Sequence, residues 1–427
     1  MIRITTGSMM HVHGALGTGT DYTVRVSVRM ADPVDPVILE KALRAAQQSF
    51  PVFCIRLRAD EQEYYFEENP LPVVLLHQSE KSCLNCAESN YHLWTVCFDE
   101  DWIHLDIFHG MTDGTGMYQV LATLLYYYCA ERYGIPPQVD LNTTDHPAGG
   151  DRRTDPQDTL SPDTLPADLL RIAPKPIGNA FTLETDGGLT SQGYAVIRDV
   201  EIPEDAFVRF TSAHDASPGT MVSLLLARAI DSLYPSRDKK IISANVVNAR
   251  PMLQAKETLA NCLSMAFFPY EDQIREMPLT EQCTIYRGMT FLQSDPGCVL
   301  PSVAASADAV RAAAAAAPTI EEKKKTFSAM FNGGEGLITY LVSYTGKWRY
   351  ADIGNYMREF WAHAPNTFGL TVQIGAAGGK IFLSIQQRFK EDTVCRAFLS
   401  QLEQNGIPYV VRREMKSDVP AFTPDCE

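Results

Sequence analysis

The sequence predicts an α/β protein of the two-layer α+β sandwich type, divided into two lobes. Its 427 residues exceed the usual size of one domain, and 45% of them are hydrophobic, enough for two cores. Segments with the period of strands and of helices are mixed in both halves of the chain. Between the halves, residues 142–178 are rich in Pro, Asp, Thr and Gly and lack an apolar period. We therefore expect an N-terminal lobe at 1–175, ending in this linker, and a C-terminal lobe at 176–427.

The first half opens with valines that alternate with polar residues at 22–30, which is typical of a half-buried strand. Asp35-Pro36 supplies an N-cap and a first-turn proline for a helix that runs to Phe50. Further strands are predicted at 52–57, 63–67 and 93–98, and an apolar stripe after residue 116 predicts a helix ending at Gly134. We interpret the N-terminus as flexible and His11 and His13 as ordinary loop histidines.

The second half continues the same mixture of elements. Helices are predicted after Pro203 and after Ser217-Pro218, and at 279–293, 304–331 and 392–404. The charged residues 321–325 are expected to form a solvated helix face. Strands are predicted at 195–200, 240–247, 262–267, 337–344, 368–375 and 380–386, the last two forming a hairpin around Gly378-Gly379.

Charge and cysteine content limit the partners and the compartment. With 52 acidic and 37 basic residues the net charge is −15, which argues against binding to nucleic acid or to an anionic membrane. The N-terminus lacks the apolar core of a signal peptide, and the apolar run at 120–130 is too short to cross a bilayer. The ten cysteines are irregularly spaced. We expect reduced thiols, a cytoplasmic location, no transmembrane segment and a monomer.

The strand predicted at 102–109 carries the main candidate for chemistry. Ile103, Leu105, Ile107 and His109 share one face, so the histidine that ends the strand points to the apolar side. A histidine with an ordinary pKa of about 6.5 holds an unprotonated nitrogen at neutral pH, as a general base requires. A lone histidine on such a face is more often a structural core residue, so periodicity alone leaves both roles open.

Asp113 follows four residues later, where the next helix begins. Its carboxylate can cap backbone N–H groups of that helix, or it can bond an arginine and brace the loop that holds His109. Both roles are architectural, so we do not assign acid–base chemistry to Asp113. Gly114 and Gly116 permit a tight turn with close backbone approach.

The pattern His109-x-x-x-Asp113-Gly114 at a strand end resembles the signature of the CoA-dependent acyltransferase superfamily. That superfamily includes chloramphenicol acetyltransferase, alcohol acetyltransferases and the condensation domains of peptide synthetases. The order of elements from residue 20 onward is similar too, as are Asn248-Ala249-Arg250-Pro251 with the following Asn261, and Ser343-Tyr344-Thr345-Gly346. The resemblance implies two chloramphenicol-acetyltransferase-like lobes with a tunnel at their interface.

The resemblance also implies a mechanism that uses acyl-CoA as co-substrate and no metal. His109 would take the proton of an alcohol or amine acceptor as it attacks the thioester. The backbone N–H near Gly114 would hold the oxyanion, with Ser343 as a helper in substrate binding. Asp113 would be a structural brace, paired with Arg250 of the second half. The phosphates of CoA would meet Lys323, Lys324, Lys325, Lys347 or Arg349, among which the sequence does not choose.

Two departures from the family pattern separate the alternatives. Condensation domains usually carry two adjacent histidines, whereas position 108 is Phe, which favours transfer from CoA over transfer from an acyl carrier protein. Plant BAHD enzymes have Asp-Phe-Gly-Trp-Gly where this chain has Ser343 to Lys347, which argues against that branch. A carrier-dependent condensation enzyme and a catalytically silent binding module of the same fold stay open as alternatives.

A second group of residues has the composition of a zinc site. Cys83-x-x-Cys86 is flanked by His77 and His92, which together could supply four ligands. The distance in sequence to each histidine is longer than in common zinc fingers. The alternative, which we favour, is a polar loop with free thiols and no metal.

Overall fold

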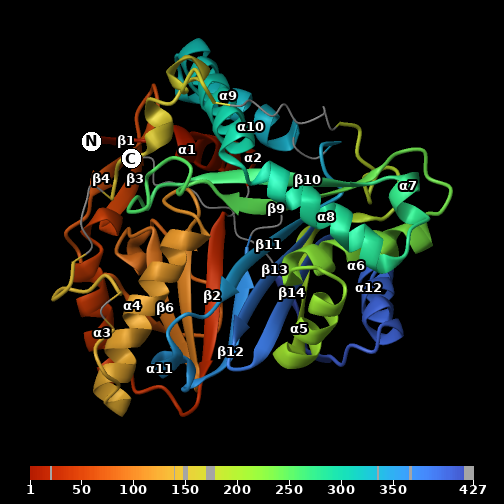
Figure 1. Cartoon of the computed structure of the whole chain (residues 1–427). Helices are drawn as coiled ribbons and strands as arrows, with labels where there is room; N and C mark the ends of the chain where they lie inside the picture. The colour runs from red at the N-terminus through yellow and green to blue at the C-terminus, as the bar shows by residue number, and fades with distance from the viewer. Residues whose placement is uncertain are drawn as a thin grey trace.

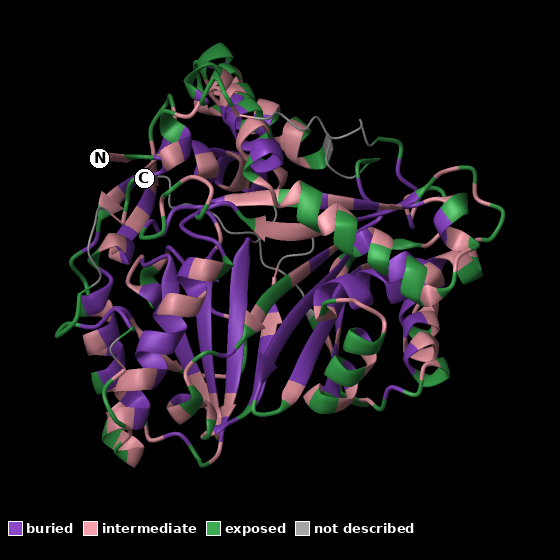
Figure 2. Cartoon of the chain, in the orientation of Figure 1, coloured by how far each residue is buried: buried purple, intermediate pink, exposed green. Residues whose placement is uncertain are grey.

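The computed structural model describes residues 1–19, 22–138, 140–147, 152–169, 178–333, 336–364 and 368–417. Two sheets form the centre of the molecule and lie side by side, with helices on their outer faces (Figure 1). The strands of both sheets are largely buried (Figure 2). The mixed architecture predicted from the sequence is therefore present.

The first sheet has five strands. In spatial order they are β12 (Met357–His363), β2 (Thr23–Met30), β7 (Trp102–Phe108), β6 (Trp94–Asp99) and β5 (Leu75–His77). Helices α3 (Pro36–Ser49) and α4 (Gly114–Tyr133) pack against each other on its outer side (Figure 1). Asp35 caps α3 by accepting hydrogen bonds from the backbone N–H groups of Val37 and Ile38. A small sheet of β1 (Ile2–Arg3), β4 (Tyr64–Glu68) and β3 (Ile55–Ala59) lies beside it.

The second sheet has seven strands, in which β11 is parallel to β9 and β13 and the other pairs are antiparallel. Its order is β10 (Leu263–Tyr270), β9 (Ile241–Asn248), β11 (Tyr340–Lys347), β13 (Leu370–Ala377), β14 (Lys380–Phe389), β8 (Ser191–Pro203) and β15 (Val410–Ser417). The helices around it are α5 (Glu204–Ala213), α6 (Pro218–Leu233), α8 (Leu279–Gln293) and α12 (Thr393–Gln404), with the single turns α7 (Asp272–Arg275) and α11 (Ala351–Gly354) elsewhere in the same half.

Strand β12 joins the two sheets. It belongs to the second half of the chain but pairs antiparallel with β2 of the first half, from Met357 opposite Met30 to His363 opposite Arg25. Its other side packs on β13 and β14, where a Cβ at Gly375 would lie 2.5 Å from the ring of Phe360. The sheet of the first half is therefore completed by the second half.

The N-terminus is helical rather than a flexible loop, which corrects the prediction for His11 and His13. Helix α1 (Thr6–Met9), a π-helical turn (Met10–Gly14) and α2 (Ala15–Thr18) follow one another without a break. The π-helical turn and α2 pack against α10 (Ile320–Gly333), and α1 packs against α9 (Pro296–Ala316). The solvated face predicted for 321–325 is present at Glu321, Glu322 and Lys325, which are exposed, but Lys323 is buried and donates to the carbonyl oxygen of Gln62.

The remaining differences from the predicted elements concern one helix, several strands and the lobe boundary. The helix predicted at 304–331 is two helices, α9 (Pro296–Ala316) and α10, because Pro318 interrupts the run. Strands β1, β5, β12 and β15 were not predicted. The predicted lobe boundary at 175 falls within residues 170–177, outside the described residues, and stays a prediction.

Helix α9 is long and apolar enough, by length and composition alone, to cross a membrane, whereas no transmembrane segment was expected. A single helix of this kind is weak support for a membrane span. Here one face of α9, including Val299, Val303 and Ala307, is buried against the protein. The guanidinium of Arg311 in the same helix bonds carbonyl oxygens of residues 157 and 160.

Candidate active site

His109 follows the last residue of β7 and begins the loop that leads into α4. Its backbone N–H donates to the carbonyl oxygen of Tyr22 on β2 at 2.8 Å, and its own carbonyl oxygen accepts from Asn261 Nδ2 at 3.0 Å. Phe108 and Gly110 are buried on either side, whereas His109 is partly exposed. The histidine is thus held through its backbone by both halves of the chain.

Asp113 and Arg250 form a bidentate ion pair across the two halves. Arg250 Nη1 lies 2.8 Å from Asp113 Oδ2, and Nη2 lies 2.9 Å from Oδ1. The side chains are 2% and 0% exposed. Arg250 also donates to the carbonyl oxygens of Thr258 and Ala260, so its guanidinium is well supplied with acceptors. A paired arginine of this kind fixes geometry as well as neutralising charge.

Further hydrogen bonds fix the motif loop to the segment that follows Arg250. Asp113 Oδ2 accepts from the backbone N–H of Cys262 at 2.9 Å, and Oδ1 accepts from Thr115 N at 3.0 Å as the N-cap of α4. Thr112 Oγ1 donates to the carbonyl oxygen of Leu259 at 2.6 Å. The two roles that the sequence left open for Asp113, N-cap and loop brace, are therefore both present in one side chain.

The glycines of the loop have different reasons to be glycine. A Cβ at Gly116 would lie 2.0 Å from Thr112 Oγ1, so a side chain there would displace the loop. A Cβ at Gly114 would meet nothing within 4 Å. Gly114 is the exposed first residue of α4, and N–H groups in the first turn of a helix have no intrahelical partner. Its N–H is therefore suited to receive developing negative charge.

Burial lowers the pKa of His109 below its ordinary value of 6.5. Interactions of the ring with carbonyl oxygens of the loop and with the Asp113 carboxylate oppose this lowering but do not reverse it. The imidazole is accordingly neutral at pH 7, which is the form that can accept a proton.

Two aromatic side chains contact the His109 ring, and the sequence did not single out either. The ring of His11 stacks on it with centroids 5.1 Å apart and planes 15° apart, and the ring of Tyr22 lies 5.1 Å away at 36°. His11 Nδ1 and the Tyr22 hydroxyl are 3.3 Å apart. Tyr22 could have been found from its place in the strand paired with the motif strand; nothing in the sequence pointed to His11.

Comparison with known proteins supports the fold and gives no close relative. No protein-family model matches the sequence, and neither does any curated protein. Among solved structures, the polyketide synthase associated protein 5 of Mycobacterium tuberculosis aligns with a TM-score of 0.62 at 12% identity, covering 94% of this chain and 96% of its own. The trichothecene 15-O-acetyltransferase of Fusarium sporotrichioides aligns at 0.61 and 13%, covering 95% and 94%. The chain has the fold of the CoA-dependent acyltransferase superfamily.

Other solved structures with a similar fold include a coenzyme A complex and a condensation domain. TRI101 of F. sporotrichioides, solved with coenzyme A and T-2, aligns with a TM-score of 0.57 at 12% identity over 96% of this chain and 99% of its own. A condensation domain from the enacyloxin polyketide synthase also matches, with a TM-score of 0.54. At such identities the likeness establishes the fold and leaves the donor and acceptor open.

The remaining sequence candidates come from β11, from α10 and from the segment after β11. Ser343 is partly exposed on β11, opposite Gln373 of β13, and no hydrogen bond joins it to His109 or Asp113 within the described residues. Lys347 pairs with Glu204 and Lys324 with Glu321, while Lys325 and Arg349 are exposed. The structure therefore does not select a cationic contact for CoA phosphates from this set.

The zinc hypothesis is not supported by the geometry. His92 Nε2 contacts the carbonyl oxygen of Leu71 at 2.7 Å, and His77 stacks on Phe98. Cys86 Sγ lies 3.4 Å from the carbonyl oxygen of Cys83. In the part of the chain that the structure describes, no three of these or other His, Cys, Asp and Glu side chains form a group that could hold a metal ion.

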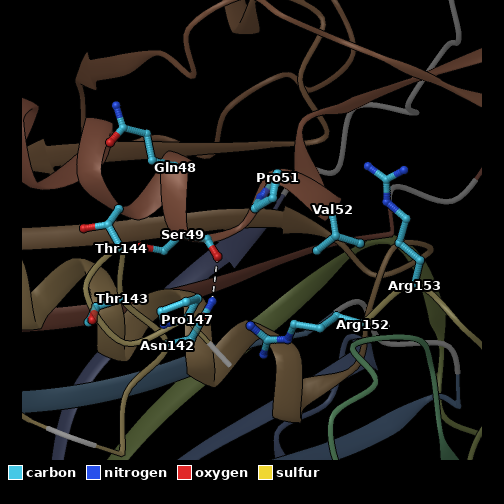
Figure 3. Close-up of a pocket in the computed structure, with 10 residues that line it drawn as sticks. All are labelled: Gln48, Ser49, Pro51, Val52, Asn142, Thr143, Thr144, Pro147, Arg152 and Arg153. Atoms are coloured by element: carbon cyan, nitrogen blue, oxygen red, sulfur yellow. Dashed lines mark hydrogen bonds between the residues drawn. The ribbon is translucent and has the colours of Figure 1, made fainter. Parts of the chain in front are cut away.

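A pocket of about 480 Å³ lies beside the end of α3, and His109 does not line it. Figure 3 shows the guanidinium of Arg152 pointing toward Asn142, which bonds the carbonyl oxygen of Ser49, while that of Arg153 points away. A smaller hollow shares Val52, Arg152 and Arg153 and reaches Met111 of the motif loop. A tunnel that passes His109 stays a prediction.

Proposed function

We propose that this protein is an acyltransferase that moves an acyl group from acyl-CoA to a small alcohol or amine acceptor, with His109 as general base. The observation that carries the proposal is the support of the motif loop. A neutral, partly exposed histidine is held through its backbone by Tyr22 and Asn261, in the loop that leads to the exposed first residue of α4, Gly114. A base and an oxyanion site side by side are the parts that acyl transfer needs.

The proposed reaction has two proton transfers and one intermediate. His109 takes the proton from the acceptor O–H or N–H as the oxygen or nitrogen attacks the thioester carbonyl carbon. The carbonyl oxygen becomes an oxyanion, which the N–H at Gly114 stabilises. The C–S bond then breaks, and the leaving thiolate of CoA takes the proton back from His109. Asp113 and Arg250 act on the loop and make no contact with substrate in this scheme.

The test is release of free thiol from acyl-CoA. The parent protein is incubated with acetyl-CoA and longer acyl-CoAs against a panel of alcohols and amines, with His109→Ala and His77→Ala beside it. His77 is the matched control because its side chain is 70% exposed and lies outside the motif. We expect acceptor-dependent thiol release by the parent and by His77→Ala, and loss of that release in His109→Ala. Equal release by His109→Ala would refute the proposed base.

A second candidate is a carrier-dependent condensation enzyme, which the match to a condensation domain favours. The same assay separates the two donors if acyl groups are also offered on a phosphopantetheinyl carrier protein. Transfer from the carrier alone would establish the second candidate. Folded protein that transfers nothing from either donor would indicate a silent binding module.

A further inference from the structure

The N-terminal helical segment places His11 directly on the proposed base. His11 lies in the π-helical turn, nearly parallel to the His109 ring, and the two ring centroids are 5.1 Å apart. Stacked aromatic pairs have centroids about 4.5–7 Å apart, so this is a direct ring contact. Val12 and His13 are buried, whereas His11, like His109, is partly exposed.

This placement is built into the packing of the segment. A Cβ at Gly7 would lie 2.4 Å from the carbonyl oxygen of Asn261, and a Cβ at Gly17 would lie 2.2 Å from Ser328 Oγ on α10. A Cβ at Gly110 of the motif loop would lie 2.9 Å from Val12 Cγ2. Gly7 N also donates to Asp155 Oδ2 at 2.8 Å. Three glycines thus permit a close approach that brings the π-helical turn onto the loop after β7.

Tyr22 connects the two imidazoles and fixes their mutual position. Its carbonyl oxygen accepts from His109 N, its ring lies 5.1 Å from the His109 ring, and its hydroxyl is 3.3 Å from His11 Nδ1. Phe331 of α10 packs edge-on against the other side of Tyr22. The torsion that turns a histidine ring about its Cβ–Cγ bond is broad, so neighbouring contacts must set the ring orientation.

Burial, rather than a charged neighbour, keeps the His11 ring neutral. Burial lowers its pKa to about 3, and the nearby His109 adds to that effect. The motif loop contributes Asp113, which is paired with Arg250. From α10, Lys323 and Lys324 act on His13, whose pKa is also lowered to about 3, mainly by burial. A neutral ring beside the base adds no positive charge that would oppose its protonation.

We propose that His11 is a positioning residue for His109, holding the imidazole of the base by ring stacking in the orientation that meets the acceptor. The inference rests on the function proposed above and adds a part of the site that comes from the N-terminal segment. His11 makes no bond with substrate in this scheme. A misplacement of about 1 Å can cost roughly 10²-fold in rate, so removal of the stack should act on kcat.

The experiment compares His11→Ala, His11→Phe and the parent protein. His11→Ala is expected to lower kcat about 10- to 100-fold with little change in KM. His11→Phe keeps a flat ring in the same place and should recover most of that loss. Loss of activity in His11→Phe equal to that in His11→Ala would overturn the role of stacking. A raised KM with an unchanged kcat would show instead that His11 contacts substrate.

A second readout does not depend on activity. The ring of His109 is titrated by NMR in protein labelled at the histidine Cε1 position, with His109→Ala used for assignment. Removal of the His11 ring admits water, so the pKa of His109 should move up toward its ordinary value in His11→Ala. His13→Phe is the matched control, because His13 lies in the same segment but stacks on Phe327 and lies tilted against Tyr64 instead.

The two readouts separate the inference from the proposed function. If the parent transfers no acyl group, the proposed function fails, and a shifted His109 titration in His11→Ala still supports positioning. If the parent is active but a folded His11→Ala keeps both the parent kcat and the parent titration, the inference is overturned. Equal effects of His13→Phe and His11→Ala on the His109 titration would also overturn it, since they would show general loosening of the segment.

Discussion

Replacement of Arg250 by Met tests whether the ion pair with Asp113 holds the motif loop. The change removes both bonds to Asp113 and leaves a carboxylate that is 0% exposed with only the N–H groups of Thr115 and Cys262. It also leaves the carbonyl oxygens of Thr258 and Ala260 without their donor. Removing one partner of a buried pair costs about 3–5 kcal/mol of unfolding free energy, a large fraction of the ~5–15 kcal/mol of a typical protein.

The assay is urea unfolding followed by tryptophan fluorescence, with Arg132→Met as the matched control. Arg132 pairs with Asp35 at 3.3 Å, but these side chains are 30% and 33% exposed, so its loss should cost only ~0–1 kcal/mol. The double variant Arg250→Met with Asp113→Leu should recover part of the loss, because the buried charge is gone while the backbone groups stay unpaired. An Arg250→Met protein as stable as the Arg132→Met protein would refute the reasoning.

Three further predictions follow from the same geometry. Because burial lowers the pKa of His109, kcat/KM should be flat through neutral pH and decline only below pH 6.5; a decline centred above pH 6.5 would contradict this. Gly116→Ala should lower Tm, because its Cβ would lie 2.0 Å from Thr112 Oγ1. Gly114→Ala should leave Tm unchanged, because its Cβ would meet nothing within 4 Å. Melting curves of the two variants, followed by circular dichroism, test this difference. His11, His13 and His104 have pKa values lowered to about 3 in the folded protein. Below pH 6.5 the unfolded chain therefore binds more protons than the folded chain. The free energy of unfolding should fall as the pH falls from 6.5 toward 3, by up to about 1.4 kcal/mol per pH unit for each histidine. In His13→Phe the urea midpoint of unfolding should fall less steeply as the pH is lowered. An unchanged slope of the midpoint against pH would contradict this prediction.

The elements that the sequence predicted well are those with strong local signals. Asp35 and Pro36 define the start of α3, and Gly378 and Gly379, both with positive φ, define the hairpin between β13 and β14. The resemblance to the acyltransferase superfamily paired Asp113 with Arg250, and the structure has this ion pair between residues 137 positions apart. Period and capping cannot supply a contact over that distance.

The features that the sequence missed depend on packing between distant segments. Strand β12 is one of the strands that pair with β2. Nothing within residues 357–363 indicates which strand it will join. The N-terminal segment is rich in glycine, which usually indicates flexibility, but here its glycines allow close contact with α10 and Asn261. The position of His11 beside His109 is set by these contacts and by no pattern in the sequence.

The place of β12 bears on how the protein folds as it is synthesised. The hydrogen-bonding edge of β2 that β12 covers is synthesised about 330 residues before its partner, as the pairing of Met30 with Met357 and of Arg25 with His363 shows. At roughly 5–20 residues per second, that edge would stay without its partner for about 15–60 s on the ribosome. An uncovered strand edge is a template for pairing with other chains. Expression at low temperature slows elongation and lengthens this interval, so the yield of native protein should depend on chaperones that shield β2 until residue 363 has emerged.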